Sequence, residues 1–138
     1  MHYGVLLAGV AAVSACGQKA FSTPVSARTS AAPDETFGCM RKQLGELGYK
    51  QTSLNTSEYR VTASKVDDKT RRSDTQFRRM LNKLDVEVAA EADGQTGIKA
   101  IGSTFAEYTT QRGPTEEQEK PSKQVTSDVH TLLERCRS

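Results

Sequence analysis

Three thiols are the most reactive side chains in this sequence of 138 residues. Cys16, Cys39 and Cys136 could act as nucleophiles, bind a metal or form disulfides. The sequence has no Cys-x-x-Cys pair, so neither a thioredoxin-like redox site nor a zinc site has support. In an exported protein, an odd number of cysteines requires a reason, such as a modified or reactive thiol. Whether the chain is exported therefore decides how its thiols are interpreted.

The residues before Cys16 have the composition of an export signal. Residues 4–15 are apolar or small and carry no charge. This run is shorter than the roughly 20 residues that span a bilayer, and it fits the apolar core of a signal peptide. A buried apolar helix is the alternative. The run ends in Val13-Ser14-Ala15-Cys16, which resembles the lipobox of bacterial lipoproteins. The resemblance covers residues 1–16 and does not assign the rest of the chain to a family.

The resemblance implies a lipid anchor. In bacterial lipoproteins the signal peptide is cut before the cysteine, so residues 1–15 would be removed. Cys16 would then carry a thioether-linked diacylglycerol and an acylated amine, with palmitate as the expected acyl group. Several acyl chains, at ~0.8 kcal/mol per buried methylene, hold a protein stably on a membrane. Gly17 stands where lipoproteins kept at the inner membrane typically have aspartate, which favours the periplasmic face of the outer membrane.

The same resemblance bears on the other two cysteines. If Cys16 takes lipid, Cys39 and Cys136 are left as one pair, and an exported compartment permits a disulfide between them. Two buried free thiols are the alternative. Val13 and Ala15 also suit an ordinary signal peptidase, which would release an unlipidated, secreted binding protein with a free thiol. No cofactor other than the covalent lipid is expected.

Arginines are concentrated in residues 69–83, which hold six basic side chains and one acidic one. Four of them could grip the phosphates or carboxylates of a lipid or an envelope polymer through bidentate hydrogen bonds. They are Arg71, Arg72, Arg78 and Arg79. The alternative is a solvated loop or short helix whose charge balances residues 84–119, where eight acidic residues accompany two basic ones.

No catalytic motif is apparent. His130 is the only histidine after the signal peptide, and Ser127 and Asp128 lie on the same predicted helical stretch, where their spacing does not build a triad. We therefore predict that the protein is not an enzyme. A net charge of +2 gives no sign of nucleic-acid binding. The composition also excludes collagen, coiled-coil, polytopic membrane and zinc-cluster proteins.

The spacing of apolar residues predicts two helices that would position the cysteines. The first begins near Asp34, as its cap, and ends at Gly48, with Cys39 near its start. The second follows the capping residue Ser122, and its apolar stripe ends on Cys136. Two antiparallel helices on one sheet face would bring the two cysteines together. Their disulfide would close a loop of about 100 residues, worth up to ~4.7 kcal/mol in the chain-entropy model.

Alternation of apolar and polar residues predicts three or four antiparallel strands between the helices. The strands expected are residues 58–66, 84–92 and 98–109, with a turn at 93–97 and a bulge at Gly102. In residues 84–92 we expect Ala90 to face inward. Residues 16–33 are expected to form a flexible tether and residues 111–121 a mobile loop. The fold class is therefore α+β, with a two-layer domain over residues 34–138.

These features predict a membrane-anchored, non-enzymatic lipoprotein. Its domain would act in the periplasm as an envelope assembly, scaffold or accessory subunit, with an envelope protein or polymer as partner and no nucleic acid. A carrier of a lipid or other small molecule is the alternative, with a pocket between the helices and the sheet. Such a pocket would be lined by Phe37, Leu44, Val86, Val88, Phe105 and Leu132.

Overall fold

The computed structural model describes residues 21–137, so the predicted signal peptide, the lipobox-like sequence and Cys16 lie outside the described residues. The fold class is α+β, as predicted, with one antiparallel sheet of six strands and two helices. In chain order the elements are β1 (Val25–Thr29), α1 (Pro33–Glu46), β2 (Lys50–Asn55), β3 (Arg60–Asp67), β4 (Phe77–Ala90), β5 (Thr96–Thr110), β6 (Gly113–Glu119) and α2 (Lys123–Cys136).

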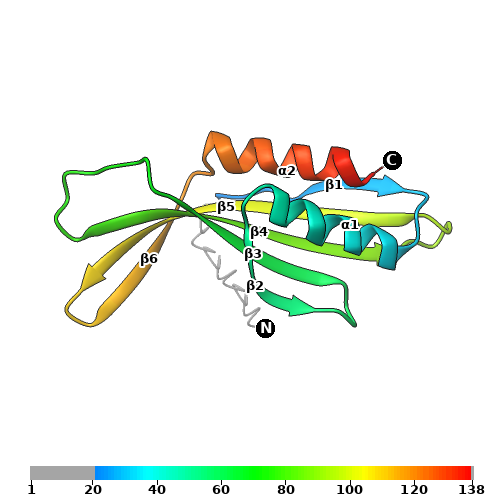
Figure 1. Ribbon diagram of the computed structural model, residues 1–138, viewed down its shortest axis with the longest axis horizontal. Coiled ribbons are helices and arrows are strands. Elements are labelled where there is room, and N and C mark those ends of the chain that lie inside the picture. The colour runs from blue at the N-terminus through cyan, green and yellow to red at the C-terminus, as the bar shows by residue number, and fades with distance from the viewer. Residues whose placement is uncertain (1–20, 138) are drawn as a thin grey trace, which may run out of the picture.

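The sheet has the order β1-β5-β4-β3-β2, and β6 also pairs with β5. β1 pairs with residues 96–100 of β5 and β6 with residues 104–110, so these two short strands share one side of β5. Both helices lie on one side of the sheet and contact each other (Figure 1). We call the opposite side the open face. One end of β4 and β5, together with β6, extends past the helices and forms what we call the arm (Figure 1).

α2 forms where the sequence predicts it. The Ser122 hydroxyl accepts a hydrogen bond from the amide of Val125, which is the N-cap arrangement expected of serine. One side of α2 is a buried apolar stripe formed by Val125, Val129, Leu132, Leu133 and Cys136. Burial of one valine or leucine side chain stabilises a fold by roughly 1.5–3 kcal/mol, so this stripe fixes α2 on the sheet.

α1 differs from its prediction at its first residues. Its N-cap is Ala32, which makes no side-chain capping bond, and Pro33 takes the first helical position. Asp34 lies in the first turn, where its charge suits the helix dipole, so its predicted role as the cap is wrong. Gly48 has a φ of +88°, the left-handed conformation that follows the end of the helix, as predicted.

A disulfide between Cys39 and Cys136 joins the two helices. The two Cα atoms are 5.7 Å apart, although 97 positions separate the residues in sequence. Cys136 is buried in the hydrophobic core, and Cys39 packs against that core. The Cys39–Cys136 disulfide, which was expected if Cys16 carries lipid, is therefore present in the structure.

The predicted tether and the predicted number of strands are wrong in part. Residues 25–29, assigned to a tether over residues 16–33, form β1, and α1 already begins at Pro33. Residues 113–119, assigned to a mobile loop, form β6. With β2, which was not predicted, these strands raise the number from three or four to six. All three lie at the rim of the sheet and bury few side chains, so they lack a clear alternation of apolar residues.

The predicted bulge at Gly102 is also wrong. β4 and β5 pair without a register shift around this residue, so Gly102 faces the helices together with Ile98, and Ile101 faces the opposite side. A Cβ on residue 102 would stand 3.0 Å from Cγ2 of Val129. The glycine therefore allows α2 to approach β5. Ala90 lies on the same face of β4 as Val88, as predicted, but is exposed because it is the last residue of the strand.

Candidate functional site

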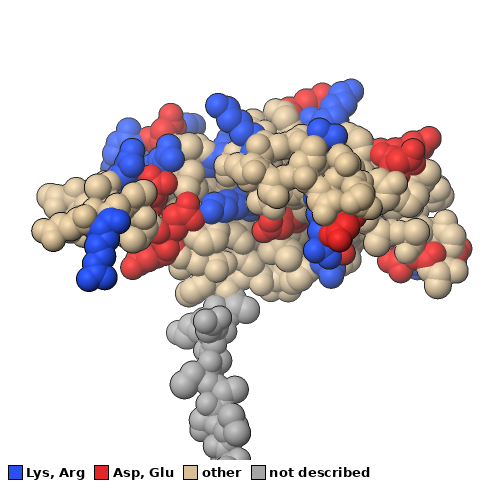
Figure 2. Space-filling model, turned by 90° about the horizontal axis from the view of Figure 1, so that it is seen from below, with Lys and Arg blue, Asp and Glu red and all other residues tan. Residues whose placement is uncertain are grey.

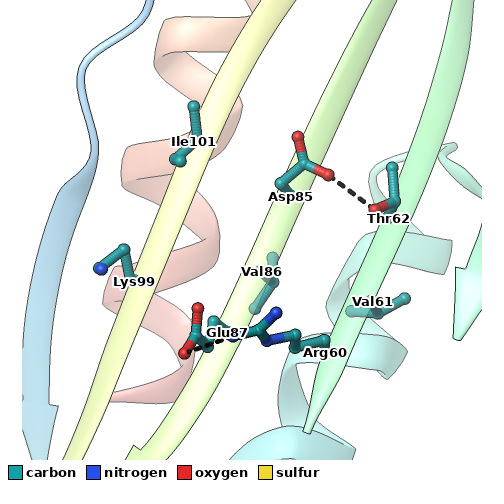
Figure 3. Close-up of a pocket in the computed structure, with 8 residues that line it drawn as sticks. All are labelled: Arg60, Val61, Thr62, Asp85, Val86, Glu87, Lys99 and Ile101. Atoms are coloured by element: carbon teal, nitrogen blue, oxygen red, sulfur yellow. Dashed lines mark hydrogen bonds and ion pairs between the residues drawn. The ribbon is translucent and has the colours of Figure 1, made fainter. Parts of the chain in front are cut away.

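Side chains of β3, β4 and β5 surround a shallow hollow of about 260 Å³ on the open face. Each strand contributes every second residue to the hollow, because successive side chains of a strand point to opposite faces of the sheet. Figure 3 shows these side chains: Arg60, Thr62, Asp85, Glu87, Lys99 and Ile101. The residues between them, such as Val61 and Val86, are buried in the core on the helix side.

Charges on this face are partly paired. Arg60 lies 3.4 Å from Glu87 and 3.8 Å from Glu58. The Thr62 hydroxyl donates a hydrogen bond of 2.6 Å to Asp85. Ion pairs as exposed as these contribute about 0–1 kcal/mol each. They therefore orient the side chains but could be exchanged for the groups of a binding partner at little cost in stability.

Asp85 and Lys99 form no ion pair with any other residue of the range 21–137. They come from neighbouring strands, with the apolar side chain of Ile101 close by (Figure 3). A second hollow of about 300 Å³ adjoins the first and shares Glu87 and Lys99 with it. A surface that offers a carboxylate, an ammonium group and an apolar side chain suits a protein surface of mixed charge better than a polyanion.

The distribution of charge on the side seen in Figure 2 also favours a partner of mixed charge over a polyanion. Figure 2 shows Lys and Arg side chains interspersed with Asp and Glu side chains, without an extended area of one sign on the side in view. A field that would steer a polyanion requires such an area.

Arg72 of the predicted arginine group is bonded within the protein. Its guanidinium donates hydrogen bonds to both carboxylate oxygens of Glu119, at 2.6 and 2.5 Å, and to the Tyr108 hydroxyl at 2.9 Å. The bonds from Arg72 lower the pKa of Glu119, and those to Glu119 raise the pKa of Arg72 further above its ordinary value. Because Arg72 lies in the β3–β4 loop (residues 68–76), this pair attaches the loop to the arm.

Arg78 and Arg79 share one carboxylate. The pairing of β4 with β5 is irregular between Phe77 and Arg79, and two consecutive side chains approach Glu107, at 3.7 and 3.3 Å. The Glu107 side chain is only 9% exposed, and a carboxylate so buried requires partners of opposite charge.

The fourth arginine, Arg71, donates hydrogen bonds to the backbone carbonyls of Asp68 and Thr70. Three of the four arginines singled out in the sequence are therefore paired with a carboxylate of this chain. An anionic ligand would have to displace Glu107 or Glu119 to be gripped by them.

Ser127, Asp128 and His130 are not brought together as a catalytic group. His130 is exposed, whereas Asp128 is buried and accepts hydrogen bonds of 2.8 Å from the Tyr49 hydroxyl and the Gln124 side chain. Burial, followed by the bond to Asp128, raises the pKa of Tyr49 well above its ordinary value. The sequence analysis missed this buried pair, because Tyr49 and Asp128 lie far apart in sequence.

Of the six residues proposed to line a carrier pocket, only Val86 borders any of four surface hollows of about 240–300 Å³ in the described residues. Phe105 lies on the open face, with the Lys83 ammonium 4.4 Å above its ring. The other five residues of the expected lining are packed in the core: Phe37, Leu44, Val86, Val88 and Leu132.

Residues 21–137 contain no group of three or more His, Cys, Asp or Glu side chains arranged to hold a metal ion. No helix in the same range is long and apolar enough to cross a membrane. No protein-family model matches the chain, and no curated protein matches it. The function must therefore be argued from the residues of the protein itself.

Proposed function

We propose that the protein is a periplasmic lipoprotein, held at the outer membrane by acyl chains on Cys16, that binds an envelope protein without catalysing a reaction. One observation carries the proposal. The disulfide uses Cys39 and Cys136, which leaves Cys16 as the odd thiol at the end of a lipobox-like sequence. A lipid on that thiol accounts for the odd number of cysteines. The disulfide also fits an oxidising, exported compartment.

The open face supports the binding role. In this proposal, a partner protein places a carboxylate against Lys99, a cation against Asp85 and apolar atoms over Ile101. Charged groups at such a surface fix the orientation of the partner and accelerate association, and salt weakens both effects. A domain that binds in this way serves as an assembly, scaffold or accessory subunit of the envelope.

Intact mass tests the anchor. The full-length protein is purified from the membrane fraction of a bacterial host and compared with Cys16→Ser, each with and without reductant. We expect loss of residues 1–15, added acyl groups and a mass increase of two hydrogens on reduction. Cys16→Ser should remain unacylated. A soluble, unacylated product with a free Cys16 would overturn the lipoprotein proposal and favour a secreted binding protein.

Crosslinking tests the binding role. A photoreactive amino acid is placed at Ala89, which is exposed and lines the adjoining hollow on the open face. As the control it is placed at position 42, which is exposed on α1 on the other side of the sheet. We expect one defined envelope protein to crosslink from position 89, to be lost with Asp85→Lys, and to be absent from position 42. The same crosslinking pattern from both positions would count against the open face as the binding surface.

A further inference from the structure

The chain is fixed to the sheet well before the predicted end of the tether. The side-chain oxygens of Ser22 and Ser103 lie 3.0 Å apart, and the Gln118 side chain donates a hydrogen bond of 3.1 Å to Ser22. Ser103 lies between the parts of β5 that pair with β1 and with β6. Residues 21–24 therefore continue the line of β1 along β5 towards β6.

This leaves a short connection to the proposed anchor. Only residues 17–20 separate Cys16 from Phe21. Even a fully extended chain of this length reaches at most ~18 Å between the two Cα atoms. A domain of 100 residues has a radius of gyration of about 13 Å, so this reach is shorter than the domain is wide. If Cys16 carries lipid, as proposed above, the surface around Phe21 must lie close to the membrane.

The surface around Phe21 has the side chains that such a position requires. Phe21 is 40% exposed and lines a hollow of about 240 Å³ beside α2. Val25, Pro121 and His130 also line this hollow, which borders the buried side chain of Val129. Aromatic and aliphatic groups of this kind enter the boundary between lipid headgroups and acyl chains.

The charge beside this hollow also suits a lipid leaflet. Lys120 and Lys123 flank Pro121 in sequence and are exposed, and neither forms an ion pair with another described residue. The adjacent acid, Glu119, is bound by Arg72. Lysines at a membrane surface are attracted by anionic headgroups.

We infer that Phe21, Pro121 and His130, with Lys120 and Lys123, form a docking surface that rests on the phospholipid leaflet holding the acyl chains of Cys16. The inference rests on the proposed lipid anchor. Docked in this way, the sheet edge with β1 and β6 faces the membrane, and β2, at the other end of the strand order, points away from it. The open face then lies roughly perpendicular to the membrane plane and stays accessible to a protein partner.

Tryptophan fluorescence tests the docking surface, because the natural sequence has no tryptophan. The full-length, acylated Phe21→Trp variant is reconstituted in vesicles of phosphatidylethanolamine and phosphatidylglycerol, with and without phospholipids brominated on their acyl chains. Leu54→Trp is the matched control, since Leu54 is 43% exposed and lies in β2 at the opposite end of the sheet. We expect emission at shorter wavelength and strong quenching for Phe21→Trp, and neither for Leu54→Trp.

The lysines are tested in the Phe21→Trp background. Lys120→Glu combined with Lys123→Glu should reduce the quenching in vesicles that contain phosphatidylglycerol. Lys50→Glu, at an exposed position in β2, should not reduce it. Equal losses of quenching from both changes would contradict a specific role of the two lysines in the docking surface.

The intact mass of each preparation separates the two proposals. Acylated Cys16 with equally weak quenching at positions 21 and 54 would overturn the docking surface and leave the lipid anchor standing. An unacylated Cys16 would overturn both. Strong quenching at position 21 alone, in acylated protein, is the result that supports docking.

Discussion

Gly102 of β5 lies directly beneath Val129 of α2. A Cβ on residue 102 would stand 3.0 Å from Cγ2 of Val129 and 3.1 Å from Cγ2 of Val125. Both valines are buried, so neither can move aside without disturbing the apolar stripe of α2. The separation of helix and sheet at this point is therefore set by the missing side chain of residue 102.

Gly102→Ala should destabilise the fold by about 1–3 kcal/mol, the usual cost of overpacking a core. Gly45→Ala is the matched control, because this exposed glycine of α1 has nothing within 4 Å of an added Cβ. Alanine there should stabilise the helix by up to ~1 kcal/mol. Urea unfolding followed by circular dichroism measures both changes. Midpoints that shift in the same direction would show that the helix does not approach the sheet at residue 102.

Arg72→Ala should detach the β3–β4 loop from the arm. The side chains of Arg72 and Glu119 are about one third exposed, so the global stability should fall by only about 1 kcal/mol or less. The local effect should be larger, and amide hydrogen exchange in residues 68–76 should become clearly faster. Arg71→Ala, in the same loop, removes only bonds to backbone carbonyls and should leave the exchange rates nearly unchanged. Faster exchange in both variants would assign the effect to the loop backbone instead.

Acid should release the same loop. The hydrogen bonds from Arg72 hold the pKa of Glu119 in the folded protein below its ordinary value of 4.5. A lowered carboxyl pKa gives stability that is present above the unfolded-state pKa and is lost as the pH falls through the folded-state pKa. Hydrogen exchange in residues 68–76, corrected for its intrinsic pH dependence, should therefore show a loop that is still attached at pH 4.5 and is released only as the pH falls further. In Glu119→Gln the contribution of the Arg72 pair to this transition should be absent, which leaves that of Asp67, whose pKa is lowered by hydrogen bonds from the Thr70 hydroxyl and the Lys69 amide.

The two helices and the central strands could be predicted because their apolar residues recur with the helical or the strand period and are buried. The stripe from Val125 to Cys136 is the clearest case. β2 could not be predicted, since all six of its residues are exposed and its place is fixed by pairing with β3. β1 and β6 could not be predicted either, because each is held by backbone hydrogen bonds to β5 more than by burial of its own side chains.

The candidate sites could be predicted only where both interacting residues can be identified from the sequence alone. The Cys39–Cys136 pair followed from the assignment of Cys16 to lipid. The arginines were recognisable as a group, but their acids were not, because Glu107 and Glu119 come from strands that pairing brings alongside. The open face could be anticipated from the alternation of β3 and β4, whereas Lys99 could be placed opposite Glu87, and Ile101 opposite Asp85, only once the register of β5 was known.

Tyr49→Phe should destabilise the core more than the loss of one hydroxyl suggests. Asp128 is buried and would keep only the hydrogen bond from Gln124 to Oδ1, so its Oδ2 atom would lose its donor. An under-satisfied buried polar group costs about 1–3 kcal/mol. Tyr108→Phe is the matched control, because its hydroxyl bonds the exposed guanidinium of Arg72, where water can replace it. Thermal unfolding at neutral pH should give a clearly larger loss for Tyr49→Phe, and equal losses would contradict the buried pair.

Loss of the disulfide should have the largest effect on stability. Cys39 and Cys136 are 97 positions apart, and a bond that closes a loop of about 100 residues is worth up to ~4.7 kcal/mol in the chain-entropy model. Small domains are stable by only about 5–15 kcal/mol, so this is a large share. Replacing both cysteines by serine, which leaves no unpaired thiol in the core, should lower the urea midpoint strongly.

Cys16→Ser is the control for that experiment, since it changes the thiol that lies outside the pair. Without reductant its unfolding midpoint should equal that of the wild-type domain, and reductant should lower both equally. In the Cys39→Ser, Cys136→Ser variant, reductant should have no further effect, because its target is absent. A reductant effect that depends on Cys16 instead would mean that this thiol takes part in a disulfide. Cys16 would then be unavailable for lipid, and this result would contradict both the proposed anchor and the Cys39–Cys136 pairing.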